Sequence, residues 1–289
     1  MKNLVMTICM NYSYEIYERF IGSLFDSVND NSVELLIFIG SNDEQYIQKF
    51  ININKDNINQ NNINQNNIKY KVIDNKNVHV VNYRFKLYYD YLIENKDIYN
   101  LIFICDSRDV LFQKNIFTHP IINNKYDLYI FEEETLDITI DKCRFNSLYI
   151  KKSGLNIENL VKDKSILCVG TILGTTHGIL KYLEKFNYIL FNIVNEENRS
   201  YYGTDSGINY YIIYGNLLNN INLCVCKNNN KLVYTLAFPN YLNLIDYNTL
   251  LNEKKQICYA NDVCYCIHQY DRLDDNIKKQ ISIKYNYEI

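Results

Sequence analysis

The hydrophobic and polar positions of the chain fall into two alternating patterns. Short apolar runs bounded by polar residues predict β-strands, and longer segments with apolar residues three or four positions apart predict amphipathic helices. The predicted strands are Leu4–Met10, Glu34–Gly40, Val78–Tyr83, Leu101–Cys105, Leu128–Phe131 and Ile166–Leu173. The predicted helices are Tyr14–Val28, Glu44–Ile53, Arg84–Glu94, His177–Val194 and Asp205–Leu218.

The order of these elements predicts an α/β fold. Strands and helices alternate through the first half of the chain, which is typical of a mostly parallel sheet flanked by helices. The uninterrupted apolar run Glu34–Gly40 suits a strand that is covered on both faces. Ligands of open α/β sheets bind beyond the carboxyl ends of the strands. The tail, Ile221–Arg272, contains several short apolar runs, and we expect this β-rich part to close over such a site.

An Asn- and Gln-rich stretch, residues 52–69, interrupts the pattern. Asn side chains compete with the backbone for hydrogen bonds and therefore favour turns over helices. We expect an exposed insertion loop that carries no chemistry.

The charge of the chain argues against a polyanionic partner. Its 289 residues carry a formal net charge of −3, with 30 Lys and Arg against 33 Asp and Glu. Binding to nucleic acid requires clustered cations that neutralise phosphates, so we expect no nucleic-acid partner. A small anionic ligand would need a few placed cations or a metal ion. No apolar run approaches the roughly 18 residues of a membrane span, and the first run is too short for a signal peptide.

The cysteines favour packing over metal binding. The chain has nine, including the pairs Cys224-x-Cys226 and Cys264-x-Cys266. A one-residue gap puts both thiols on the same face of a strand, whereas zinc sites more often use C-x2-C spacing in turns. Zinc is the alternative interpretation. Reduced thiols are the default inside cells, which indicates a cytoplasmic protein.

The most unusual feature is the stretch DSRD, which follows the apolar strand Leu101–Cys105 directly. Asp106 and Asp109 would face opposite ways in a continuing strand, but a turn at Ser107–Arg108 would bring them together. Two carboxylates at a turn suit Mg²⁺ or Mn²⁺, and the Arg108 guanidinium suits a phosphate or a carboxylate. The alternative is an Asp–Arg salt bridge that caps the turn.

Three other stretches contain candidate residues. His268, in IHQYDR, lies at the end of an apolar run and is either a packed residue or a third metal ligand. Asp205, in GTDSGIN, is either a helix N-cap or a carboxylate that addresses an acceptor hydroxyl. Gly170 and Gly174, in CVGTILGTT, permit either close approach to a ligand or close packing.

Five stretches follow one another along most of the chain: CMNYSYEIYERFIGSL, DSRDVLFQKNIF, CVGTILGTTHGILKYL, TDSGIN and IHQYDR. In this order they resemble the GT-A-type nucleotide-sugar glycosyltransferases, in a branch that carries a D-x-R-D-V-x-F-Q block where a D-x-D motif is standard. The resemblance implies one catalytic domain over residues 1–289, with a nucleotide-binding half, 1–120, and an acceptor- and sugar-binding half, 121–289.

The resemblance also implies an activity and a metal. It implies transfer of a sugar from a UDP- or GDP-linked donor to a hydroxyl of a glycan acceptor, assisted by Mn²⁺ or Mg²⁺. By position, Asp106 matches the first carboxylate of the D-x-D motif, and Asp109 supplies the second one residue late. His268 matches the late histidine that completes the metal shell. Arg108 occupies the third motif position and either replaces or accompanies the metal on the diphosphate.

Further roles are carried over from the same resemblance. Asp205 and Asp106 are the expected catalytic carboxylates. The expected donor-binding residues are Asn11, Tyr12, Arg84, Arg108, Gly170 and Thr171.

Two other functions remain open at this point. A non-catalytic glycan- or nucleotide-binding descendant of the same fold is favoured by the arginine in the motif. A metal-dependent phosphodiesterase could use Asp106, Asp109 and Glu132–Glu134, although the chain lacks the basic surplus of nucleases. The sequence contains no P-loop, no G-x-G-x-x-G fingerprint and no G-x-S-x-G, which argues against the enzyme classes defined by those motifs.

Overall fold

The computed structural model of the chain describes residues 1–28, 31–53, 67–74, 78–123 and 125–284. The chain forms two compact units, each assembled from separate segments. The first unit consists of Met1–Asp74, Phe103–Asn123 and Lys227–Ile289, and the second of Asn75–Ile102 and Asn124–Cys226. The functional halves expected from the sequence stay a prediction.

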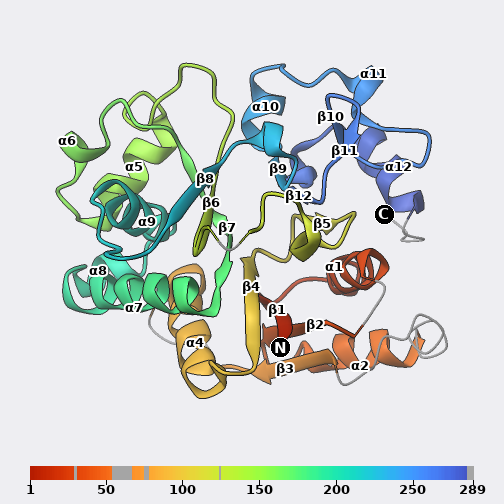
Figure 1. The fold of residues 1–289 in the computed structure, drawn as a ribbon, viewed down its shortest axis with the longest axis horizontal. Coiled ribbons are helices and arrows are strands. Elements are labelled where there is room, and N and C mark those ends of the chain that lie inside the picture. The colour runs from red at the N-terminus through yellow and green to blue at the C-terminus, as the bar shows by residue number, and fades with distance from the viewer. Residues whose placement is uncertain (29–30, 54–66, 75–77, 124, 285–289) are drawn as a thin grey trace. The chain divides into compact units, whose positions relative to one another are not determined.

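The first unit is built on parallel strands. β1 (Lys2–Cys9) pairs in parallel with β2 (Val33–Ile39), which pairs in parallel with β3 (Ile68–Val72). Every residue of β2 is buried, as expected for a strand that is covered on both faces. Two helices of this unit, α1 (Tyr14–Ser27) and α2 (Glu44–Ile53), appear in red and orange in Figure 1.

A smaller sheet in the first unit joins the middle of the chain to its tail. β4 (Tyr99–Cys105) carries the chain into this unit, and a short turn leads from it to β5 (Val110–Phe112). β5 pairs antiparallel with β12 (Cys266–His268), and β12 pairs in parallel with β9 (Val233–Thr235). The tail therefore lies against the strand that follows the turn.

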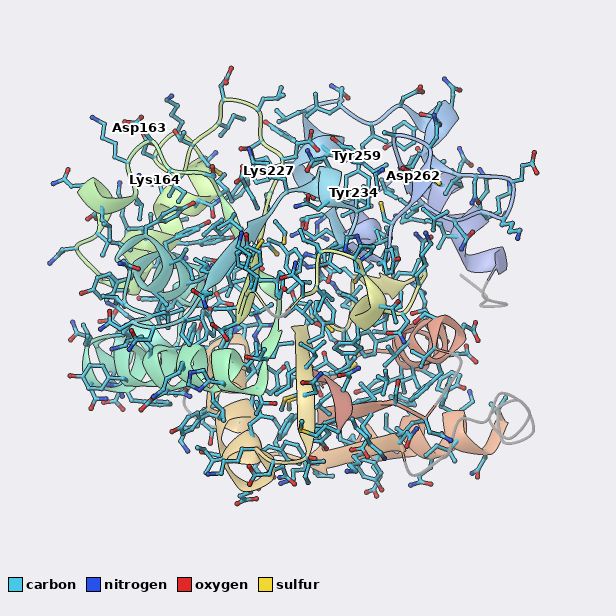
Figure 2. The ribbon with its side chains drawn as sticks, viewed as in Figure 1. Asp163, Lys164, Lys227, Tyr234, Tyr259 and Asp262 are labelled. Atoms are coloured by element: carbon cyan, nitrogen blue, oxygen red, sulfur yellow. The ribbon has the colours of Figure 1, made fainter. Side chains whose placement is uncertain are left out.

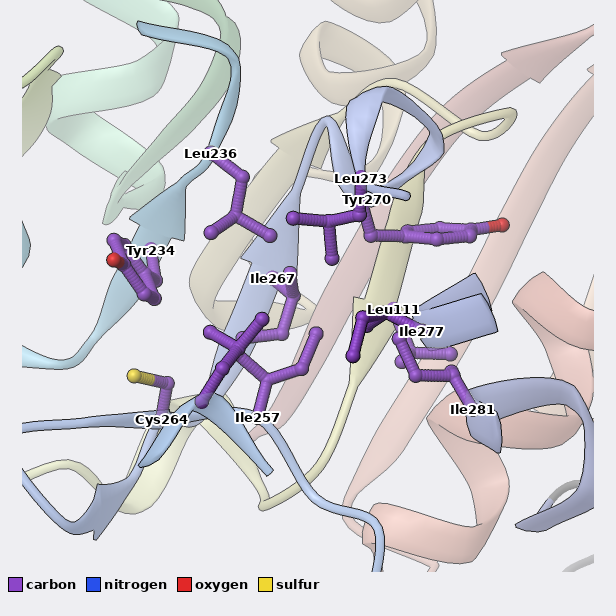
Figure 3. Packing of buried hydrophobic residues seen from close by; sticks show 11 residues of the cluster. Leu111, Tyr234, Leu236, Ile257, Cys264, Ile267, Tyr270, Leu273, Ile277 and Ile281 are labelled. Atoms are coloured by element: carbon purple, nitrogen blue, oxygen red, sulfur yellow. The ribbon is translucent and has the colours of Figure 1, made fainter. Parts of the chain in front are cut away.

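An apolar cluster holds this small sheet in place (Figure 3). It consists of Leu111, Tyr234, Leu236, Leu250, Ile257, Cys264, Ile267, Tyr270, Leu273, Ile277 and Ile281. Tyr234 also meets Tyr259 edge to face, with ring centroids 5.2 Å apart (Figure 2). Neighbouring side chains of a strand point to opposite faces. Because Ile267 belongs to the cluster, the next side chain, His268, points away from it.

The second unit combines strands with longer helices. β6 (Leu128–Glu132) pairs antiparallel with β7 (Leu167–Thr175) and in parallel with β8 (Leu223–Cys226). Phe85 and Phe186 stack with ring centroids 3.8 Å apart and join two helices. The longer helices are α4 (Val80–Asn95), α5 (Arg144–Ser153), α7 (Thr176–Asn192) and α9 (Thr204–Tyr214).

Shorter elements complete both units. The first unit also contains η2 (Ile116–Thr118), η3 (Asn228–Asn230), α10 (Ala237–Tyr241), α11 (Tyr247–Leu250), β10 (Cys258–Tyr259), β11 (Asp262–Val263), η4 (Tyr270–Arg272) and α12 (Asp275–Lys284). The second also contains α6 (Glu158–Val161) and α8 (Glu196–Arg199). Over the described ranges, no helix has both the length and the apolar character that crossing a membrane requires.

The predicted fold class is confirmed, because the strands are mostly parallel and helices flank them. The predicted strand Val78–Tyr83 is wrong, since helix α4 begins at Val80. The His79 side chain accepts a hydrogen bond from the backbone N–H of Val81 at 3.4 Å and caps this helix. The buried side chains of α4 that recur at helical spacing include Phe85, Tyr88 and Leu92.

Two other predictions need correction. Most of the predicted insertion, 52–69, lies outside the described residues, but its last two residues belong to strand β3, which was not predicted. The tail contains the expected short strands, yet it is less β-rich than predicted. Helices α10 and α11 interrupt it, because the apolar run that ends in Ala237 and Phe238 turns into a helix after β9.

Candidate functional site

Hydrogen bonds to β1 anchor the turn that follows β4. The Thr7 hydroxyl donates to the carbonyl of Cys105 at 2.8 Å, at the last residue of β4. The Ser107 hydroxyl donates to the carbonyl of Ile8 at 2.9 Å. Both hydroxyl groups belong to buried residues. The chain therefore leaves the sheet at a fixed point, and the predicted turn is present.

This turn and strand β12 bring together two carboxylates and an imidazole. The pairing register sets His268 opposite Val110, the residue after Asp109. Nε2 of His268 lies 3.6 Å from Oδ2 of Asp106 and 3.7 Å from Oδ1 of Asp109. The backbone N–H of Gln269 donates to the carbonyl of Asp109 at 2.7 Å and fastens the two segments together. The three residues predicted as metal ligands thus form one cluster in the first unit.

The donor set of this cluster fits a divalent cation. One ligand atom from each of Asp106, Asp109 and His268 lies within 4.8 Å of the other two. The two Nε2–Oδ separations, 3.6 and 3.7 Å, exceed an ordinary hydrogen bond of about 2.7–3.2 Å. They agree with two ligands that each lie about 2.1 Å from one ion. Carboxylate oxygens are common ligands of Mg²⁺ and of Mn²⁺, and an imidazole nitrogen is a common ligand of first-row transition metals.

The surroundings of Asp109 make its ionised form costly. Burial raises the pKa of the Asp109 carboxyl above its usual range, and the neighbouring carboxylates of Asp106 and Asp271 raise it further. The His268 imidazole and the Arg108 guanidinium act in the opposite direction and lower this pKa. A cation held at the cluster would favour the ionised carboxylate in the same way.

The two carboxylate oxygens of Asp109 have different neighbours: Oδ1 lies near His268 and Oδ2 lies near Arg108. Its Nη2 atom is 3.4 Å from Oδ2 of Asp109 and 3.3 Å from Oδ2 of Asp271. The alternative interpretation of the motif, an Asp–Arg salt bridge at the turn, is therefore also present. The side chain of Arg108 is 43% exposed, whereas that of Asp109 is only 7% exposed.

Asn11 and Tyr12 follow β1 in the same unit. Asn11 has a positive φ of 59°, and its backbone N–H donates to Oδ2 of Asp43 at 3.0 Å. Burial raises the pKa of the Tyr12 hydroxyl, and the Arg108 guanidinium lowers it. The carboxylates of Asp106 and Asp109 raise the same pKa. Two of the predicted donor-binding residues, Tyr12 and Arg108, thus lie near the cluster in the first unit, and Asn11 is the residue before Tyr12.

A separate polar cluster lies in the second unit. Nη2 of Arg84 is 3.3 Å from Oδ2 of Asp205, with side chains that are 4% and 7% exposed. Asp205 is the second residue of α9, and its Oδ1 accepts a hydrogen bond from the backbone N–H of Ser206 at 2.9 Å. The N-cap position belongs to Gly203. The N-cap interpretation of Asp205 is therefore wrong, and a buried ion pair takes its place.

The glycine-containing strand β7 contributes to the same unit. The carbonyl of Val169, immediately before Gly170, lies 3.4 Å from Nη2 of Arg84. The Thr171 side chain is fully buried. A Cβ atom on Gly174 would lie 2.5 Å from the carbonyl oxygen of Asp127, so close packing explains this glycine.

Two polar residues were missed as site candidates. Asp271 pairs with Arg272 at 2.6 Å, and its position three residues after the end of β12, in the stretch IHQYDR, was the available signal. Asn82 is fully buried, and its Oδ1 accepts a hydrogen bond from the backbone N–H of Asp205 at 3.0 Å. In so Asn-rich a sequence no local signal distinguished it.

Comparisons with known proteins identify the fold. No family model matches the chain, and no curated protein matches it. A solved structure of an active-site mutant of LgtC has a TM-score of 0.57 at 10% identity, over 99% of this chain and 96% of that one. A structure of galactosyltransferase LgtC in complex with donor and acceptor sugar analogs has a TM-score of 0.56 at 10% identity, with coverage of 99% and 96%. The chain therefore has the GT-A fold of LgtC, and at this identity the likeness shows the fold alone.

Proposed function

We propose that the protein is a glycosyltransferase that moves a sugar from a nucleoside-diphosphate sugar to a hydroxyl of a glycan acceptor, with a divalent metal. One observation supports this most directly. In a chain with the fold of LgtC, Asp106, Asp109 and His268 lie within 4.8 Å of one another at the carboxyl end of β4. Ligands of open α/β sheets bind at such strand ends.

The proposed metal is Mn²⁺ or Mg²⁺, held by Asp106, Asp109 and His268. When bound, such an ion would supply positive charge to the diphosphate of a donor and would stabilise the charge that develops on the leaving group. Arg108 is exposed enough to reach a phosphate and supplies a further positive charge. Asn11 and Tyr12 are proposed to contact the nucleotide, which is UDP or GDP.

Asp205, on helix α9, is proposed to address the sugar or the acceptor. Asp205 is the proposed catalytic carboxylate, and its ion pair with Arg84 at 3.3 Å fixes its position. Arg84, Gly170 and Thr171 are the proposed donor-binding residues of the second unit. Asp106 is the second proposed catalytic carboxylate, and it would act by holding the metal ion.

A donor screen tests the proposal. Release of UDP or GDP from a panel of nucleotide sugars is measured with and without Mn²⁺, on the full chain. We expect one donor to be turned over only with the metal, and Asp106→Asn or Asp109→Asn to reduce turnover by at least about 10²-fold, the typical loss of an electrostatic contribution. Asp262→Asn is the matched control, because that carboxylate is exposed and pairs with Lys231 away from the cluster. Full activity of both cluster variants would contradict the proposal.

A second candidate is a non-catalytic protein of the same fold that binds nucleotides or glycans. The observation that favours it is the ion pair between Arg108 and Asp109, which engages one of the proposed metal ligands. Calorimetry with UDP- and GDP-sugars and Mn²⁺ separates the two candidates. Binding without turnover of any donor would favour the second.

A further inference from the structure

Arg108 pairs with two carboxylates, of which only Asp109 belongs to the proposed metal site. Its Nη2 atom is 3.4 Å from Oδ2 of Asp109 and 3.3 Å from Oδ2 of Asp271. Asp109 turns its other oxygen, Oδ1, toward His268 at 3.7 Å. Asp271 also pairs with Arg272 at 2.6 Å. One guanidinium nitrogen is therefore shared by a proposed metal ligand and by a carboxylate outside the metal cluster.

The exposed part of the Arg108 guanidinium has capacity for another ligand. Both ion pairs use Nη2, and the side chain is 43% exposed. Nε is buried, so a ligand from solution would meet the terminal nitrogens. The separations of 3.3 and 3.4 Å are longer than the usual charge-assisted hydrogen bond of about 2.7–2.9 Å. The guanidinium therefore makes a long ion pair with each of the two carboxylates.

We propose that Arg108 is a counter-cation that competes with the metal for Asp109, and that Asp271 is the positioning residue that holds Arg108 aside when the metal binds. The inference rests on the proposed metal site. With a cation held by Asp109 and His268, the Arg108 guanidinium would be repelled from Asp109, because two cations on one carboxylate repel each other. Arg108 would then pair with Asp271 and present its exposed terminal nitrogens to the diphosphate of a nucleotide.

We expect Arg108→Gln to strengthen the binding of Mn²⁺ and to weaken the binding of the nucleotide. Arg108→Gln removes the competing charge, so we expect Mn²⁺ to bind about tenfold more tightly. It also removes a cation from the diphosphate, so we expect UDP or GDP to bind the Mn²⁺-loaded protein about tenfold more weakly. A variant that was merely misfolded would weaken both ligands. Arg108→Lys keeps the charge and should bind Mn²⁺ as the wild type does.

The role of Asp271 requires a double-mutant cycle. Asp271→Asn leaves Arg108 with Asp109 as its remaining carboxylate, so Mn²⁺ should bind roughly tenfold more weakly. In the Arg108→Gln background the same change should alter Mn²⁺ affinity by less than about twofold. A long-range charge effect of Asp271 would be the same in both backgrounds. Arg272→Gln is the matched control, because Arg272 pairs with Asp271 and not with Asp109.

The experiment is a titration of the full-length protein with Mn²⁺, followed by electron paramagnetic resonance of the free ion, with and without UDP or GDP. Tighter Mn²⁺ binding by Arg108→Gln, together with weaker nucleotide binding, supports the proposal. If the wild type binds Mn²⁺ and Arg108→Gln does not bind it more tightly, the proposal is overturned and the proposed function stands. If neither protein binds Mn²⁺, the proposed metal site itself is overturned, and with it this inference. If neither UDP nor GDP binds, the role of Arg108 toward the diphosphate is overturned.

Discussion

Breaking the buried ion pair between Arg84 and Asp205 should destabilise the second unit strongly. The two side chains are only 4% and 7% exposed, and their charged atoms are 3.3 Å apart. Removing one partner of a buried pair costs about 3–5 kcal/mol, because the other charge stays buried without compensation. Arg84 also contacts the carbonyl of Val169, and Asp205 also accepts a hydrogen bond from the backbone N–H of Ser206, so neither side chain depends on the ion pair alone. We therefore expect the lower end of that range, about 3 kcal/mol.

The assay is thermal and urea unfolding of the full chain for Asp205→Asn, Arg84→Met and the double variant. A loss of about 3 kcal/mol lowers the midpoint temperature by roughly 5 °C in a protein of this size. The double variant buries no unpaired charge, so its loss should be smaller than the sum by at least about 1.5 kcal/mol. The control is the exposed ion pair between Lys86 and Asp90, which lies on α4 like Arg84. Replacing either residue of this pair should lower the free energy of unfolding by less than about 0.5 kcal/mol.

Two results would refute this reasoning. Single variants that unfold like those of the exposed control pair would show that the buried charges do not depend on each other. Strict additivity in the double variant would show the same. The result also matters for function, since activity lost in Asp205→Asn can be assigned to chemistry only at temperatures where that variant is folded.

Three further predictions address the metal, the thiols and the packing. Mn²⁺ affinity should fall as the pH is lowered, beginning above the usual Asp range near about 4, because burial raises the pKa of Asp109 and protons compete with the metal for its carboxylate. Among the thiols, Cys224 is half-buried and should react first with an aromatic disulfide, whereas Cys264, whose pKa burial raises to about 12, should react only on unfolding. Gly178→Ala should cost about 1–3 kcal/mol in unfolding experiments, because the added Cβ would meet the carbonyl oxygen of Asp127.

Each of these predictions has a result that contradicts it. Mn²⁺ affinity that is constant from neutral pH down to the ordinary Asp range would remove Asp109 from the metal shell. An unchanged rate for the fastest thiol in Cys224→Ser would show that another cysteine reacts first. Wild-type stability in Gly178→Ala would show that the backbone at Asp127 yields without cost.

The sequence predicts most of the sheet because burial leaves a clear pattern there. The continuous apolar run of β2 is buried at every position, and helix α2 has the predicted bounds, Glu44–Ile53. Propensity misled the prediction at Val80 and Val81, whose β-branched side chains are typical of strands. They form the first turn of α4 because the helix is selected by the side chains it buries further along.

Part of the site could be predicted because it follows a strand with a clear pattern of buried residues. Asp106 and Asp109 stand next to an unmistakable strand, so their turn could be expected from local sequence. Their association with His268 depends on strand pairing between β5 and β12, which no local pattern reveals. The resemblance to a known family supplied that link. The two partners of Arg108 and the buried contact between Arg84 and Asp205 also join distant segments, and only the packed structure shows them.

The central claim is that the imidazole of residue 268 and the two carboxylates of the acidic turn hold one divalent ion. Pulsed electron paramagnetic resonance of the Mn²⁺-loaded protein measures this directly, because a coordinated imidazole nitrogen modulates the electron-spin echo. We predict a nitrogen modulation in the wild type that disappears in His268→Gln, while Mn²⁺ remains bound more weakly. Tightly bound Mn²⁺ without a nitrogen signal, or the same signal in both proteins, would contradict the account.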